Sequence, residues 1–214
     1  MNSLLRGLYK TISLSVLIQL FKTLKAGLYT TLFLPVAGPY LSWTIVAMPF
    51  FLRIIAIACI GAPATLYALC YGLPSLMGSL YFKAYHEILT GKTHYAAKTF
   101  QVTVPLACMA LFIMNPVGSK ASLYTLYWIF PCLFPLMPHR STFLAALASS
   151  LTMHAVGSVL FIYSFPTIST FWIGLIPLVF FERFAHALAI TTLYTLTRVI
   201  KKCSASPFLR LIFA

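Results

Sequence analysis

The chain has no aspartate, and its only acidic residues are Glu87 and Glu182. Charged residues of both signs make up 8% of the 214 residues, whereas a soluble domain carries about a quarter. So few charges cannot cover a surface that faces water, and lipid must be the solvent. Membrane enzymes built on aspartate pairs, such as intramembrane aspartyl proteases, prenyl transferases and CDP-alcohol transferases, are excluded.

The usual motifs of enzymes and metal sites are also missing. The chain has no Gly-rich phosphate loop and no GxSxG, and Thr90 stands where the pair His86-Glu87 would need a second histidine for a zinc protease. Its five cysteines form no CxxC, so we interpret them as packing residues. We therefore expect no enzyme, cofactor or metal. A membrane-embedded hydrolase or transferase that pairs Glu182 with a histidine is the alternative.

Long apolar runs are present along the whole chain, which is 61% hydrophobic. They predict an all-α bundle of six transmembrane helices in a domain over residues 26–200. A basic amphipathic helix over residues 1–25 would lie on the membrane surface, and residues 201–214 would form a basic tail. A seventh span over 11–34 is the rival. The six spans are placed at 27–50, 54–80, 100–114, 121–137, 142–164 and 171–195.

Net charge is +13, and its distribution predicts orientation rather than nucleic-acid binding. With six spans, twelve of the fifteen Lys and Arg residues fall on one side, including three in the polar segment 83–98. We predict a cytoplasmic loop at 83–98, which could be partly helical, and a plasma or inner membrane location with both termini cytoplasmic. The lipid bilayer, and its anionic headgroups, would be the first partner.

The run over 171–200 contains a charged cluster, Glu182, Arg183 and His186. Charge inside an apolar run is costly in lipid and marks a functional site. Glu182 and His186 share a helix face, whereas Arg183 points about 100° away. We predict that the cluster binds a solute, with His154 and Arg53 as candidate partners. The alternatives are a structural ion pair of Glu182, a packing role for His154 and an interfacial role for Arg53.

Small and aromatic residues suggest how the spans pack. The run 141–165 is rich in alanine, serine and glycine, which predicts a buried span in close contact with its neighbours. Trp43, Trp128 and Trp172 would be anchors at the membrane interface, together with Tyr124. Alternatively, a tryptophan could stack on a planar ligand.

The segment Ile60–Pro74 contains Gly61 and Pro63, then small residues, then Gly72-Leu73-Pro74. This resembles the run found in substrate-binding (S) subunits of energy-coupling-factor vitamin transporters. The resemblance covers residues 49–82 and carries over no binding residue. It implies a six-span protein with cytoplasmic termini that binds a small solute between its spans, while other chains supply the ATPase and coupling subunits.

These observations lead to one functional hypothesis and one rival. We predict a membrane protein that binds or translocates a small-molecule solute, because Pro- and Gly-broken spans around a buried charge recur at transporter sites. The rival is a structural or assembly subunit of a membrane complex that contacts other membrane proteins through its small-residue faces.

Overall fold

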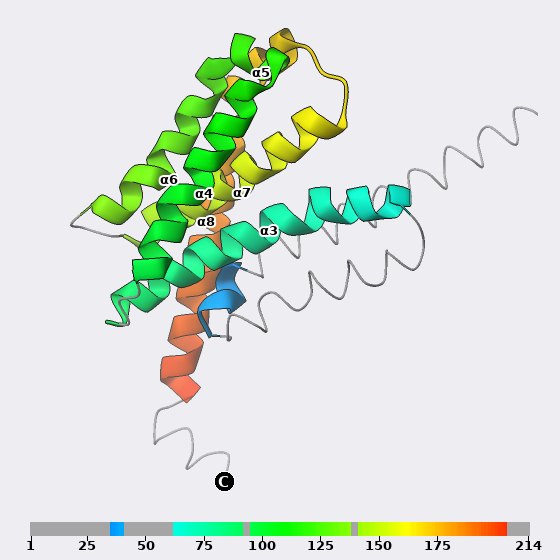
Figure 1. The fold of residues 1–214 in the computed structure, drawn as a ribbon. Helices are drawn as coiled ribbons and strands as arrows, with labels where there is room; N and C mark the ends of the chain where they lie inside the picture. The colour runs from blue at the N-terminus through cyan, green and yellow to red at the C-terminus, as the bar shows by residue number, and fades with distance from the viewer. Residues whose placement is uncertain (1–34, 41–61, 92–94, 138–140, 205–214) are drawn as a thin grey trace, which may run out of the picture.

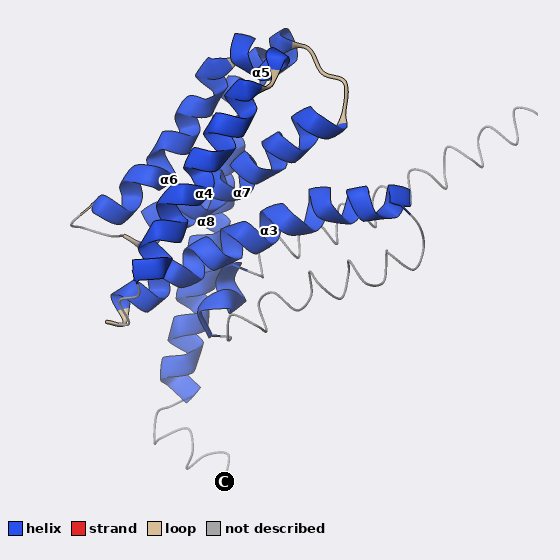
Figure 2. Ribbon diagram, in the orientation of Figure 1, coloured by secondary structure: helices blue, strands red, loops and turns tan. Residues whose placement is uncertain are grey.

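The computed structural model describes residues 35–40, 62–91, 95–137 and 141–204 (Figure 1). Nearly all of these residues are helical, and none lies in a strand (Figure 2). The longer helices are α3 (Ala62–Leu89), α4 (Tyr95–Met114), α7 (Thr142–Ser164) and α8 (Ser169–Ser204). The shorter elements are η1 (Gly38–Tyr40), α5 (Pro116–Lys120), η2 (Ser122–Trp128), α6 (Ile129–Leu133) and η3 (Phe134–Leu136). The prediction of an all-α fold is confirmed for this part of the chain.

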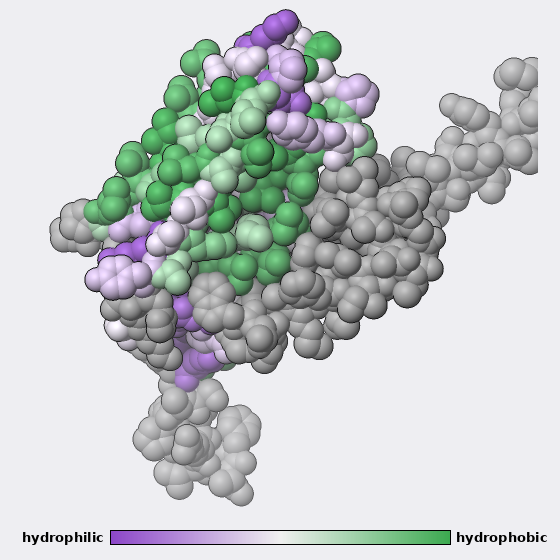
Figure 3. Space-filling model, viewed as in Figure 1, coloured by the Kyte–Doolittle hydropathy of each residue, from purple (hydrophilic) through white to green (hydrophobic). Residues whose placement is uncertain are grey.

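Within the described residues, three helices are long and apolar enough to cross a membrane: Tyr95–Met114, Thr142–Ser164 and Ser169–Lys201. The shortest has 20 residues, or about 30 Å of helix, which matches the hydrocarbon thickness of a bilayer. The described surface has an apolar middle, with hydrophilic residues toward its two ends (Figure 3). Three of the six predicted spans therefore have membrane-capable helices in the structure, while 27–50 lies largely outside the described residues.

Two predictions about the middle of the chain need correction. The predicted span 121–137 is a run of short pieces, η2, α6 and η3, that together form a 15-residue apolar helix, Ser122–Leu136. Pro131 and Pro135 lie within it, and proline removes a backbone donor and favours short or kinked helices. The predicted loop 83–98 is mostly helix, because α3 continues to Leu89 and α4 begins at Tyr95.

Helix α7 occupies the centre of the bundle and packs against both α3 and α8. It begins at a serine cap, where the Leu144 amide donates to Ser141 Oγ at 3.1 Å. Its alanines, and its serines other than Ser164, are buried, which confirms the prediction for this span. The Ser149 hydroxyl donates to the carbonyl oxygen of Gly78 in α3 at 2.7 Å. Small side chains thus bring the α3 and α7 backbones close together.

Candidate functional site

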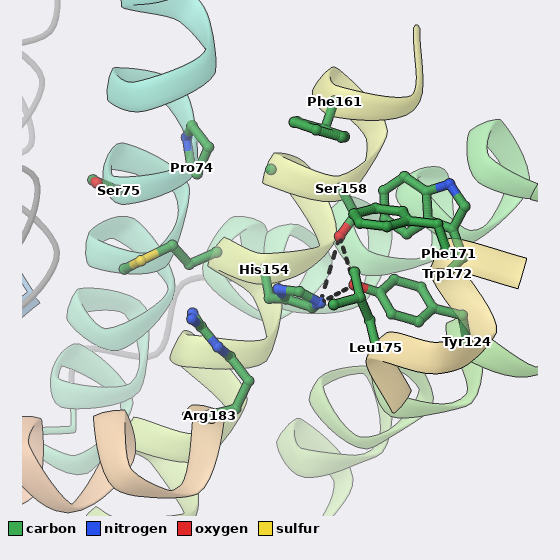
Figure 4. Close-up of a pocket in the computed structure, with 12 residues that line it drawn as sticks. Pro74, Ser75, Tyr124, His154, Ser158, Phe161, Phe171, Trp172, Leu175 and Arg183 are labelled. Atoms are coloured by element: carbon green, nitrogen blue, oxygen red, sulfur yellow. Dashed lines mark hydrogen bonds between the residues drawn. The ribbon is translucent and has the colours of Figure 1, made fainter. Parts of the chain in front are cut away.

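A cavity of about 350 Å³ that is largely open to the outside lies between α3, α7 and α8, and Tyr124 of η2 contributes to its wall (Figure 4). Its walls are mostly apolar, with Pro74 from α3, Phe161 from α7, and Trp172 and Leu175 from α8. Pockets that bind small molecules are typically 300 to 1,000 Å³, largely apolar, and carry a few polar groups that fix orientation. The polar groups of this cavity therefore decide what it could hold.

Three polar side chains meet on one wall of the cavity. The hydroxyl of Tyr124 lies 2.6 Å from Nε2 of His154, and Ser158 Oγ lies 3.4 Å from each of those two atoms (Figure 4). His154 and Ser158 are four residues apart, so one face of α7 carries both. Either the tyrosine or the imidazole can donate, according to the imidazole tautomer. The trio is a hydrogen-bonded network whose members satisfy one another inside an apolar bundle.

Arg183 is the charged residue in the cavity lining (Figure 4). Its side chain is 11% exposed, and one terminal nitrogen donates to Glu182 Oε1. Nε is buried and has no hydrogen-bond partner among the described residues. A guanidinium carries five N–H donors and no acceptor. An unpaired donor of a charged group is expensive in an apolar interior.

The structure separates the residues of the predicted cluster. Arg183 and His154 both line the cavity. The Glu182 side chain is 55% exposed and touches the cavity only indirectly, as the partner of Arg183. His186, one turn further along α8, lies outside the lining. Arg53 lies outside the described residues. Arg183 is thus the cluster residue that lines the cavity, although it was expected to point away from the helix face that Glu182 and His186 share.

The tryptophans also differ from the prediction. Trp128 is fully buried and Trp172 is 2% exposed, so neither is an outward-facing interface anchor. Both pack edge-on against Phe112, with ring centroids 5.3 and 5.1 Å apart. Tyr124, 1% exposed, stacks on the same phenylalanine. Phe112, Trp128 and Trp172 thus pack around the ring of Tyr124, which belongs to the polar trio. Trp43 lies outside the described residues.

A second polar cluster lies where α3 ends beside the C-terminal part of α8. His86 Nδ1 is 2.7 Å from the Tyr194 hydroxyl, and Lys83 pairs with Glu87 at 3.0 Å. Lys201 Nζ lies 3.6 Å from the ring centroid of Tyr40. Burial, and then the nearby cation Lys83, lower the pKa of His86. His86 lies beyond the predicted span 54–80, and none of these residues lines the cavity.

No protein-family model, curated protein or solved structure matches the chain. The resemblance to S subunits therefore stays a prediction.

Two members of the site, Tyr124 and Ser158, were not among the predicted binding residues. Tyr124 is 30 positions from His154 in sequence, so only the tertiary fold brings them together. Ser158 carried a usable signal, because it lies one turn from His154 in a run otherwise made of packing residues. A pair of polar residues at i and i+4 within an apolar helix therefore indicates a candidate site, as a charge does.

Proposed function

We propose that the protein is an integral membrane protein that binds a small solute in the cavity between α3, α7 and α8, as a step in moving that solute across the membrane. The observation that supports this most is Arg183, a charged side chain that lines an apolar cavity and whose buried Nε has no hydrogen-bond partner among the described residues. Ionisable groups within membrane bundles are rare and mark solute or ion pathways. A purely structural arginine would be expected to have its donors satisfied by the protein.

Ligand-dependent stabilisation tests solute binding. A ligand that binds only the folded state raises the unfolding temperature as its concentration exceeds Kd. Purified protein in detergent or nanodiscs would be screened against small organic solutes. Gly157 lines the cavity, and a Cβ there would meet Pro74 at an ordinary 3.6 Å, so Gly157→Leu should fill the space and abolish the ligand effect. Gly174→Leu is the matched control, because a Cβ at Gly174 meets nothing within 4 Å. Equal ligand responses in both variants would refute the site.

The finer topology is also a proposal: six spans in the plasma or inner membrane, with both termini cytoplasmic. The distribution of Lys and Arg supports it, since cytoplasmic segments carry the positive excess. Protease accessibility of tags placed at each terminus, in intact cells and in inverted vesicles, is the test. Tags cleaved from opposite sides of the membrane would require an odd number of spans and would contradict the proposal.

Partners distinguish the transport hypothesis from the assembly hypothesis. The resemblance to S subunits supports ATPase and coupling subunits as partners of a transporter. The assembly alternative depended on small-residue faces, and the largest of these, on α7, is buried against α3 and α8 within the chain. Purification under mild conditions should therefore recover ATPase and coupling subunits in fixed proportion. A different stable membrane complex, without solute binding, would favour assembly.

A further inference from the structure

We infer that the solute is a small organic anion, with a carboxylate or similar oxoanion group joined to an apolar, preferably aromatic, body. The inference rests on the proposed function and names the class of solute for the same cavity. Three features of the cavity support this class of solute: the charge of its lining, the N–H donors of Arg183 and the shape of its apolar wall.

Acidic residues are scarce in this protein. The whole chain has two acidic residues, Glu87 and Glu182, and neither lines the cavity. Organic cations and metal ions are normally held by carboxylates, so the cavity lacks the groups that would attract them. Its lining instead includes the guanidinium of Arg183. Glu182 balances that charge from the exposed side, which leaves the positive end of the pair nearer the cavity.

The guanidinium of Arg183 keeps donors beyond those that Glu182 uses. Glu182 accepts from Nη2, and the Arg183 side chain, 11% exposed, lines the cavity. A guanidinium carries five N–H donors and no acceptor, so its pair with Glu182 leaves N–H groups for a second anion. A neutral carbonyl brings no charge, whereas a carboxylate or similar oxoanion forms charge-assisted hydrogen bonds, which are shorter and stronger. An anionic group therefore suits Arg183 better than a neutral acceptor.

The apolar wall sets the rest of the molecule. Phe161 lies at the far end of the cavity from Arg183, and Trp172 and Phe171 lie along one side (Figure 4). The rings of Phe171 and Trp172 meet edge-on, with centroids 5.5 Å apart, and this fixes their orientation. Flat apolar groups pack well against such surfaces. The solute would thus place its anionic group at Arg183 and its apolar body toward Phe161.

Paired probes test the inference. Benzoate, 1-naphthoate and hexanoate would each be compared with the corresponding primary amide, using the purified full-length protein and direct titration. At least one carboxylate should bind about 10- to 100-fold more tightly than its amide, because charge-assisted bonds are worth this much. Arg183→Gln should remove the difference while amide binding persists, which shows that the fold survives. Arg183→Lys should restore part of the difference in affinity between carboxylate and amide, since lysine returns the charge without the planar donors of a guanidinium.

Glu182→Gln and Lys120→Gln complete the design. Glu182→Gln removes the carboxylate that competes for the guanidinium, so the carboxylates should bind more tightly and the amides should not change. Lys120 is exposed in α5, outside the cavity lining, and its loss should have no effect. Equal binding of carboxylates and amides by the wild-type protein would overturn the anion inference and leave solute binding intact. Failure of every probe to bind the folded protein would count against both proposals.

Discussion

Replacing Gly78 by alanine should weaken the contact between α3 and α7 on which the cavity depends. A Cβ at this position would lie 2.8 Å from Cε and 3.1 Å from Cβ of Met153, and 3.2 Å from the backbone oxygen of Ser149. The methionine end can move, but the backbone oxygen and the Met153 Cβ are fixed in α7. Overpacking of this kind costs about 1–3 kcal/mol. Alanine is intrinsically better in a helix by about 1 kcal/mol, so the expected net loss is about 0–2 kcal/mol.

The matched control is Gly174→Ala in α8, where a Cβ meets nothing within 4 Å. That change keeps only the gain in helix propensity and should stabilise the protein by up to about 1 kcal/mol. The two alanines should therefore differ by about 1–3 kcal/mol in the free energy of unfolding, measured by denaturant titration in detergent micelles. Combining Met153→Ala with Gly78→Ala should recover part of the lost stability, because it removes Cε of Met153, the atom closest to the new Cβ. Equal stabilities of the two single variants would refute the close α3–α7 packing.

Three further predictions concern other polar groups. Tyr124→Phe leaves Nε2 of His154 with only the distant Ser158 hydroxyl, and should cost about 1–3 kcal/mol of unfolding free energy, unless Ser158 moves closer and satisfies it. The pKa of His86 is lowered from 6.5 in the folded state, so protonation favours unfolding. The unfolding free energy should therefore fall as the pH drops below 6.5, and the fall should be smaller in His86→Gln. Ser141→Ala removes the cap of α7 and should cost about 1 kcal/mol in the same titration, and no loss would show that the cap does not matter.

Some of this architecture could be predicted because lipid imposes simple rules on sequence. The runs at 142–164 and 171–195 are long and apolar; the first coincides with α7, and the second lies within α8, which continues to Ser204. The small residues of α7 also indicated burial correctly, because alanine and serine allow close backbone approach. The segment 121–137 is apolar too, but it forms the short pieces η2, α6 and η3, and hydropathy alone does not register this.

The candidate site was predictable only in part. A charge in an apolar run pointed to Glu182 and Arg183, but the choice between them depends on how α8 is rotated against α7, which no local pattern determines. The burial of Trp128 and Trp172 likewise depends on how their helices pack together, which no local pattern determines. An aromatic residue near the end of an apolar run has the same sequence signature whether it faces headgroups or the protein core. Tertiary packing decides which of these occurs.

The most direct test of the central claim is to locate a bound solute within the cavity. Crystals of the protein soaked with 4-bromobenzoate would give an anomalous signal from bromine. We predict a bromine peak between Phe161 and Trp172, with the carboxylate within hydrogen-bond distance of the Arg183 guanidinium. A bound probe found only on the outer surface of the bundle, or a cavity that stays without bromine at saturating concentration, would contradict it.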